Sequence, residues 1–141
     1  MPGPCVFCGV VDGSVPASVV GVDDHTVAFL DRSPVFKGHV LVVPRHHVVT
    51  LPDLDAAAVG PLFDTVRRVS AALPPALDAD GTWVAINNVV SQSVAHLHVH
   101  VVPRRRKDGL RGFFWPRVRY VSDDEMADYA ARIAAVLATT A

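Results

Sequence analysis

Several features are scarce or missing in this 141-residue chain, and each absence narrows its class. A formal net charge of −1 gives no general attraction for a polyanion. Only two cysteines occur, and their C-x-x-C spacing favours metal or redox use over a structural disulfide. No apolar run is as long as a membrane span, and the start, MPGPCVFCGV, lacks the pattern of a signal peptide. We therefore expect a cytoplasmic protein with no membrane contact.

Length and composition indicate one globular domain over residues 1–141. Half of the residues are hydrophobic and 19% are charged, and we find no internal repeat or linker. The charge is uneven, because seven of the thirteen Lys and Arg residues lie within 104–119. An acidic group follows at Asp123, Asp124, Glu125 and Asp128. Residues 105–141 therefore read as a basic and aromatic segment followed by a helix.

Short β-branched runs separated by turns predict five strands, at 17–22, 25–30, 39–43, 82–86 and 96–102. A first helix is expected within 54–73, with Asp53 as its N-cap and a kink or a late start at Pro61. A second helix follows the capping box of Ser122 and Glu125. Strands joined mostly by short turns predict an α+β domain, with an antiparallel sheet of about five strands and two main helices.

The run His96-Leu97-His98-Val99-His100 is the most informative part of the sequence. In an extended strand, alternate side chains share a face, so three imidazoles would line one face and the intervening residues would enter the core. This clustering of groups that titrate near neutral pH indicates chemistry rather than packing. A neutral imidazole can attack phosphorus, while neighbouring rings bind phosphate oxygens or pass a proton. His98, flanked by a histidine on each side, is the expected nucleophile.

Other polar residues are ambiguous when each is taken alone. Gln92 and Ser93 end the loop before the histidines, where they could donate to anionic oxygens or could simply satisfy the turn backbone. His39 alone would be an ordinary strand residue, and Asp31 an ordinary turn residue. Gly38 permits a close backbone approach or an unusual φ beside His39.

Together these residues resemble the histidine triad, or HIT, superfamily of nucleotide hydrolases and transferases, whose H-x-H-x-H-x-x signature matches residues 96–102. The resemblance covers about residues 5–104. Further motifs of the family recur in order: Cys5-Val-Phe-Cys8, Ala28-Phe-Leu-Asp31, Gly38-His-Val-Leu-Val-Val-Pro44, His47, Asn87-Asn88 and Gln92-Ser-Val94. The chain departs from the pattern at Ser91, where the family usually has glycine, and in a shorter loop after Asn87.

The resemblance implies roles for individual residues. His98 would form a nucleotidyl-histidine intermediate, from which water releases a nucleoside monophosphate such as AMP, and His100 and His39 would contact the phosphate or the leaving group. Asp31 would bind the ribose hydroxyls. The rest of the purine nucleotide site would comprise Asn87 or Asn88, Gln92 and Ser93 at the phosphate, and Phe7, Val10, Phe29 and Leu30 at the base. Because members are commonly homodimers, we expect a homodimer.

Cys5 and Cys8 admit three interpretations: a redox pair, two unrelated buried thiols, or half of a zinc site. A thioredoxin-like pair begins a helix after a strand, whereas this pair precedes the first predicted strand. The zinc-containing branch of the family completes its site with two histidines, which implies the ligands Cys5, Cys8, His47 and His96, with His46 as an alternative to His47. Four protein ligands leave no open position, so this zinc would be structural, one ion per chain.

Several functions stay open at this point. Pro103-Arg104 resembles the dinucleoside polyphosphate hydrolases of the family, whereas Trp115-Pro116 resembles the phosphoramidases. The nucleotidyltransferase branch typically has proline at the position of Leu97. Two alternatives are a nucleotide-binding module without turnover and a nucleic-acid-binding module. The latter would use the basic segment with Phe113, Phe114 and Trp115, but it leaves the triad unexplained.

Overall fold

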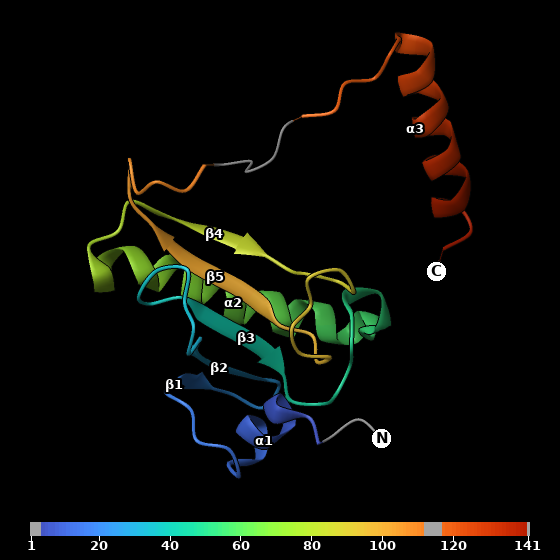
Figure 1. The fold of residues 1–141 in the computed structure, drawn as a ribbon. Coiled ribbons are helices and arrows are strands. Elements are labelled where there is room, and N and C mark those ends of the chain that lie inside the picture. Colours follow the sequence, from blue (N-terminus) through green and yellow to red (C-terminus); the bar gives the residue numbers. More distant parts are fainter. Residues whose placement is uncertain (1–3, 112–116, 141) are drawn as a thin grey trace. The chain divides into compact units, whose positions relative to one another are not determined.

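The computed structural model describes residues 4–111 and 117–140 (Figure 1). Phe113, Phe114, Trp115 and Pro116, on which part of the sequence interpretation rests, lie outside this range. The described helices are α1 (Val6–Asp12), α2 (Ala56–Leu77) and α3 (Asp123–Leu137), with a 3-10 turn η1 at Leu51–Asp53. The described strands are β1 (Val19–Val22), β2 (Thr26–Leu30), β3 (Val40–Pro44), β4 (Gly81–Ala85) and β5 (Val99–Arg104). They form one antiparallel sheet in the order β1-β2-β3-β5-β4, which confirms the predicted α+β class.

The two faces of the sheet bury different side chains. On one face, alternate strand residues pack with Leu62, Val66 and Leu73 of α2, which runs along the sheet (Figure 1). On the other face, the intervening strand residues pack with Phe7 and Val10 of α1. The central strand β3 has side chains packed on both faces of the sheet and is buried along its whole length. Burial on both faces explains the unbroken apolar sequence of this strand.

Sequence reasoning missed α1. Its sequence, Val-Phe-Cys-Gly-Val-Val-Asp, holds three valines and a glycine, which are poor helix formers. Caps offset this low propensity. The Cys5 Sγ accepts a hydrogen bond from the Cys8 backbone N–H, and Gly13, at φ 86°, donates from its own N–H to the Val10 carbonyl. Phe7 and Val10 are buried, so tertiary packing completes the helix.

The boundaries of α2 differ from those predicted. Asp55, not Asp53, is the N-cap, and its carboxylate accepts from the Ala57 N–H at 3.1 Å. Asp53 is used elsewhere, because it closes a capping box with Thr50 at the start of η1. The helix continues through Pro61, so the late start expected there is wrong. Two aspartates with capping ability occur in this segment, and only the contact with Thr50 decides between them.

The strand predicted at 96–102 is also displaced, because β5 covers Val99–Arg104. His96 and His98 lie before it, and the Leu97 N–H donates to the Val48 carbonyl at 2.7 Å in the loop after β3. The ladder starts later because this stretch faces a loop rather than a strand. The predicted alternation still holds, since Leu97 and Val99 are fully buried on the α2 face.

Residues 1–108 and 109–141 form two compact units. In the second unit, the Ser122 hydroxyl accepts from the Glu125 N–H at the start of α3, as predicted, but the Glu125 carboxylate accepts from the Val121 N–H and so does not close the predicted capping box on Ser122. None of the residues of α3 is buried. Within the described part of the chain, no helix is both long enough and apolar enough to cross a bilayer.

Candidate active site and metal centre

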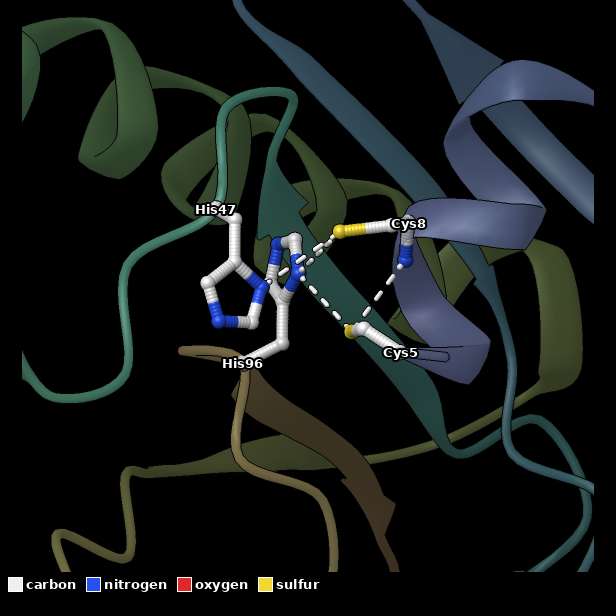
Figure 2. Close-up of side chains that lie close together, drawn as sticks. All are labelled: Cys5, Cys8, His47 and His96. Carbon is white, nitrogen blue, oxygen red and sulfur yellow. Dashed lines mark hydrogen bonds between the residues drawn. The ribbon is translucent and has the colours of Figure 1, made fainter. Parts of the chain in front are cut away.

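Two cysteines and two histidines from distant parts of the chain meet beside α1 (Figure 2). Cys5 is the N-cap of α1 and Cys8 lies in its first turn, whereas His47 comes from the loop after β3 and His96 from the segment before β5. One ligand atom from each residue lies within 4.8 Å of the others. His46, the alternative to His47, is not part of this described cluster.

The distances in the cluster match those of a tetrahedral metal site. Zinc–sulfur bonds of about 2.3 Å and zinc–nitrogen bonds of about 2.0 Å place neighbouring ligand atoms about 3.5 Å apart. The His96 Nδ1 lies 3.5 Å from the Sγ of both cysteines, and the His47 Nδ1 lies 3.4 Å from the Cys8 Sγ. The His96 Nε2 lies 2.9 Å from the Pro44 carbonyl, which can only accept, so Nε2 carries the proton. Its Nδ1 lone pair is thereby free to bind a metal.

The same logic fixes the tautomer of the central triad histidine. The His98 Nδ1 lies 2.7 Å from the His96 carbonyl, so Nδ1 carries a proton and donates it. The neutral ring therefore has an unprotonated Nε2, which is the nitrogen that can act as a nucleophile. The His98 side chain is only 3% exposed, and the edge contact with Phe7, at 5.1 Å between ring centroids, restricts its rotation.

His39 and His100 are joined by a hydrogen bond between their rings. The Val35 backbone N–H donates to the His39 Nδ1 at 3.1 Å, so the proton of the neutral His39 ring is on Nε2. This Nε2 donates to the His100 Nδ1 at 2.9 Å, which leaves the His100 proton on its own Nε2. That nitrogen is buried and has no hydrogen-bond partner among the described residues. An unpaired buried donor beside a nucleophile is suited to bind an oxygen of an incoming anion.

The position of His39 depends on the preceding glycine. Gly38 has φ 98°, and a Cβ there would lie 2.2 Å from a methyl group of Leu77. Both the unusual φ and the close approach that the sequence suggested are therefore present. The partly exposed Asp31 carboxylate lies 3.7 Å from the Nδ1 of the buried His39 ring.

Both histidines of this pair are held in the neutral form. Burial, reinforced by the charges of His98 and His39, lowers the pKa of His100 from 6.5 to about 4. Burial also lowers the pKa of His39, against the opposing effect of the Asp31 carboxylate. Near neutral pH, His100 is therefore a neutral hydrogen-bond donor.

These lowered pKa values predict that the protein loses stability as the pH falls from about 6.5 towards about 4. The unfolded chain takes up a proton at the ordinary histidine pKa, whereas the folded chain resists it, so the stabilisation is complete above that pH. For His100 the loss approaches about 3 kcal/mol. Urea unfolding at about pH 7.5 and about pH 4.5 measures it. In the His100→Gln variant, the free energy of unfolding should depend less on pH than in the wild type. The His25→Gln variant, changed at an exposed position, should behave like the wild type. Equal pH dependence in the two variants would contradict the lowered pKa of His100.

A pocket of about 440 Å³ adjoins the histidines. Its lining includes eight of the residues predicted for the site: Phe7, Val10, Phe29, Leu30, Asp31, Ser93, His98 and His100. It also includes residues that sequence reasoning missed, among them Val6, Val15, Leu41 and Val94. The result is an apolar chamber with a carboxylate and two imidazoles at its walls, which suits a flat base joined to a ribose phosphate. A larger cavity of about 600 Å³ lies between α2 and β1–β2, but no histidine lines it.

Three predicted substrate-binding residues do not line this pocket: Asn87, Asn88 and Gln92. The Gln92 side chain instead bridges two loops, donating to the Val49 carbonyl at 2.6 Å and accepting from the Val89 N–H at 3.0 Å. The Asn88 Oδ1 accepts from the Leu51 N–H at 2.8 Å. The sequence allowed Gln92 and Ser93 either to bind anionic oxygens or to satisfy the turn backbone. The Gln92 side chain contacts the loop backbone, whereas Ser93 lies at the pocket wall.

The same loop contains two residues in the left-handed region. Val89 has φ 70° and Ser91 has φ 61°. Position 91 is where the HIT pattern has glycine, and a positive φ explains that preference. A β-branched residue such as Val89 adopts this conformation at a cost of about 1–3 kcal/mol, so the Gln92 and Asn88 contacts are needed to hold the loop.

The orienting groups that sequence reasoning missed are mostly backbone atoms: the Val35 N–H and the carbonyls of Pro44 and His96. Any residue type supplies these atoms. The sequence therefore carries no signal for them, and only the folded chain places them opposite the imidazoles.

Comparison with known proteins gives a consistent result. The family model of the HIT domain matches residues 12–107, which include the three triad histidines. The crystal structure of a HIT family member from Bacillus subtilis has a TM-score of 0.85 and 30% identity, and covers 94% of this chain and 96% of that one. A Zn-bound histidine triad family protein from Mycobacterium smegmatis has a TM-score of 0.72 and 33% identity over 96% of each chain. An adenylylsulfatase of Arabidopsis thaliana is 32% identical over 75% of this chain and 55% of that protein.

Proposed function

We propose, from the premise that this chain belongs to the HIT domain family, that it is a nucleotide hydrolase acting at the α-phosphate of a purine nucleotide. The main support is the His98 imidazole, which lies in the wall of a nucleotide-sized pocket. Its Nδ1–H donates to the His96 carbonyl, so its Nε2 is unprotonated. Asp31, in the same wall, is suited to accept hydrogen bonds from ribose hydroxyls. Phe7, Val10, Phe29 and Leu30 would enclose the base.

In the first step, the His98 Nε2 attacks the α-phosphorus, an N–P bond forms, and the bond from phosphorus to the leaving group breaks. The imidazole thereby becomes positively charged, and its Nδ1–H donates more strongly to the His96 carbonyl. The unpaired Nε2–H of the neutral His100 ring donates a hydrogen bond to a phosphate oxygen or to the leaving group, and the leaving group takes its proton from solvent. His39 keeps His100 in the donating tautomer.

In the second step, a water oxygen attacks the same phosphorus and the N–P bond breaks. The products are the nucleoside monophosphate, the neutral His98 ring and one proton. Ser93 at the pocket wall would bind the phosphate, while Gln92 and Asn88 would hold the loop that carries Ser93. Asn87 is exposed and is the amide left available to a ligand.

The residues Cys5, Cys8, His47 and His96 would hold one structural zinc ion per chain. The near-tetrahedral spacing of their ligand atoms supports this proposal, as does the similarity to a Zn-bound relative. With four protein ligands, such an ion supplies rigidity and no open coordination position for substrate.

The leaving group could be an amine, an acyl phosphate or a second nucleotide. Similarity to an adenylylsulfatase adds sulfate to this set. Nucleotidyl transfer is less favoured, because Leu97 stands where that branch has proline. The test is an assay of the purified protein with adenosine phosphoramidate, adenylated lysine, adenylylsulfate and diadenosine polyphosphates, each labelled in the AMP moiety. We expect at least one to yield AMP through a labelled protein intermediate, and consumption of none of them would count against hydrolysis and favour a binding module without turnover.

We propose further that the protein acts as a cytoplasmic homodimer, as the family resemblance implies. The edge strand β4 offers a surface for this, since its Val84 is 41% exposed. Sedimentation velocity showing only monomers would contradict it.

Nucleic-acid binding has less support, because two residues of the basic segment have structural contacts. Arg104 pairs with Asp108, and Arg105 donates to the Leu77 and Asp78 carbonyls at the end of α2.

A further inference from the structure

We infer that the Cys/His cluster and the nucleotide pocket are coupled, so that zinc bound at the cluster strengthens the binding of a purine nucleotide. The inference rests on the proposed function, because it needs both a metal at the cluster and a nucleotide in the pocket. Two physical connections carry it: the helix α1 and the residue His96.

The first connection is α1, which belongs to both sites. Cys5 and Cys8, at its first turn, face the two histidines of the cluster. Val6, Phe7 and Val10 on the same turns line the nucleotide pocket. Phe7 stands between the two cysteines in sequence, and its ring meets those of His98 and Phe29 at centroid distances of 5.1 and 5.3 Å. A displacement of the cysteines therefore displaces the wall of the pocket.

Little else secures α1 to the sheet. Its backbone hydrogen bonds stay within residues 5–15, and none in the described part of the chain reaches a strand. A helix of seven residues is too short to be stable by itself. The packing of Phe7 and Val10 and the sulfur–imidazole contacts of the cysteines hold it in place. Metal ligation turns those weak contacts into four bonds, and so removes freedom that the nucleotide would otherwise have to restrict.

The second connection is His96, which joins the cluster to the nucleophile. Its Nδ1 faces both cysteine sulfurs, and its Nε2 donates to the Pro44 carbonyl. Its own backbone carbonyl accepts from the His98 Nδ1. Fixing the His96 ring fixes the backbone that orients His98 in the pocket wall. His96 is thus a positioning residue for His98 as well as a metal ligand.

Coupling of this kind is reciprocal. If zinc strengthens nucleotide binding by a given factor, the nucleotide strengthens zinc binding by the same factor. For two sites that share one short helix and one residue, we expect a factor on the order of ten. The affinity for AMP should therefore fall about tenfold when zinc is removed, and AMP should slow the loss of zinc to a chelator.

The test uses His47→Asn, with His46→Asn as its matched control. His47 contacts Cys8 and His96 but does not line the nucleotide pocket, so its loss can reach AMP only through the cluster. His46 is its exposed neighbour outside the cluster. Calorimetric titration with AMP is done on zinc-loaded and zinc-stripped protein, and zinc affinity is measured by chelator competition with and without saturating AMP.

At limiting zinc, the His47→Asn variant should bind AMP about tenfold more weakly than the wild type, whereas His46→Asn should match the wild type. The two directions of the coupling should agree. Equal AMP affinity with and without zinc, in protein that binds both, overturns the coupling and leaves the proposed function intact. Failure of every form to bind AMP overturns the coupling together with the proposed function. Failure to bind zinc overturns the coupling but not nucleotide hydrolysis.

Discussion

Replacing His98 with alanine is expected to lower hydrolysis by at least about 10⁴-fold, because it removes the atom that attacks phosphorus. The protein should no longer become labelled when it is incubated with substrate carrying a labelled AMP moiety. Binding of AMP should change only a few-fold, since the residues proposed to contact the base and the ribose are other members of the pocket lining. A large loss of turnover with little loss of binding distinguishes a nucleophile from a residue that only binds substrate.

His98 is buried against Phe7, so alanine also leaves space in the wall. His98→Asn keeps a polar group near the His96 carbonyl and separates this packing effect from the chemical one. His25→Ala, at an exposed position outside the pocket, is the matched control and should retain full activity. Rapid quenching and intact-protein mass spectrometry would detect the intermediate. Hydrolysis that persists in both His98 variants would show that the nucleophile lies elsewhere.

The second large effect concerns the metal. The Cys8→Ser variant is expected to lose the proposed zinc ion and to unfold at a temperature lower by on the order of 10 °C. The reason is that the Cys8 sulfur contacts both histidines of the cluster, so the replacement removes the contact of α1 with the His47 ring and one of its two sulfur contacts with His96. Native mass spectrometry gives the zinc content, and scanning calorimetry gives the change in melting temperature.

Two controls make this result specific. His46→Asn leaves the cluster intact and should keep both the zinc and the melting temperature of the wild type. Chelation of the wild-type protein should reproduce the effect of Cys8→Ser, and chelation of Cys8→Ser should add little. A zinc-free wild-type protein of equal stability and full activity would mean that the four residues come together without holding a metal.

Much of the fold follows from local sequence patterns. The short β-branched and apolar runs at 25–30 and 39–43 correctly predicted β2 and β3, because both strands are buried along nearly their whole length. Local patterns failed where tertiary contacts compete with them. Helix propensity alone could not predict α1, whose valines and glycine are held by the packing of Phe7 and Val10. The sequence predicted Asp53 as the N-cap of α2, but in the fold its carboxylate accepts from Thr50.

The candidate site divides in the same way. The sequence placed His98 between two other histidines and paired Cys5 with Cys8, because these relations are short-range. It could not distinguish His47 from His46 as a partner of the cysteines, since that choice depends on how the loop after β3 approaches α1. Nor could it foresee that Gln92 would bridge two loops rather than line the pocket.

The sequence by itself determined which chemical groups are available and their order along the chain: three imidazoles at alternate positions, two thiols at C-x-x-C spacing, and an antiparallel α+β scaffold. Only the tertiary structure decided which nitrogen carries the proton in the rings of His39, His96 and His98. That choice is made by the His96 and Pro44 carbonyls and the Val35 N–H. The physical reason is that a tautomer depends on the hydrogen-bond partner of each ring nitrogen. These partners are backbone atoms, identical in nearly every residue, which only folding brings within reach.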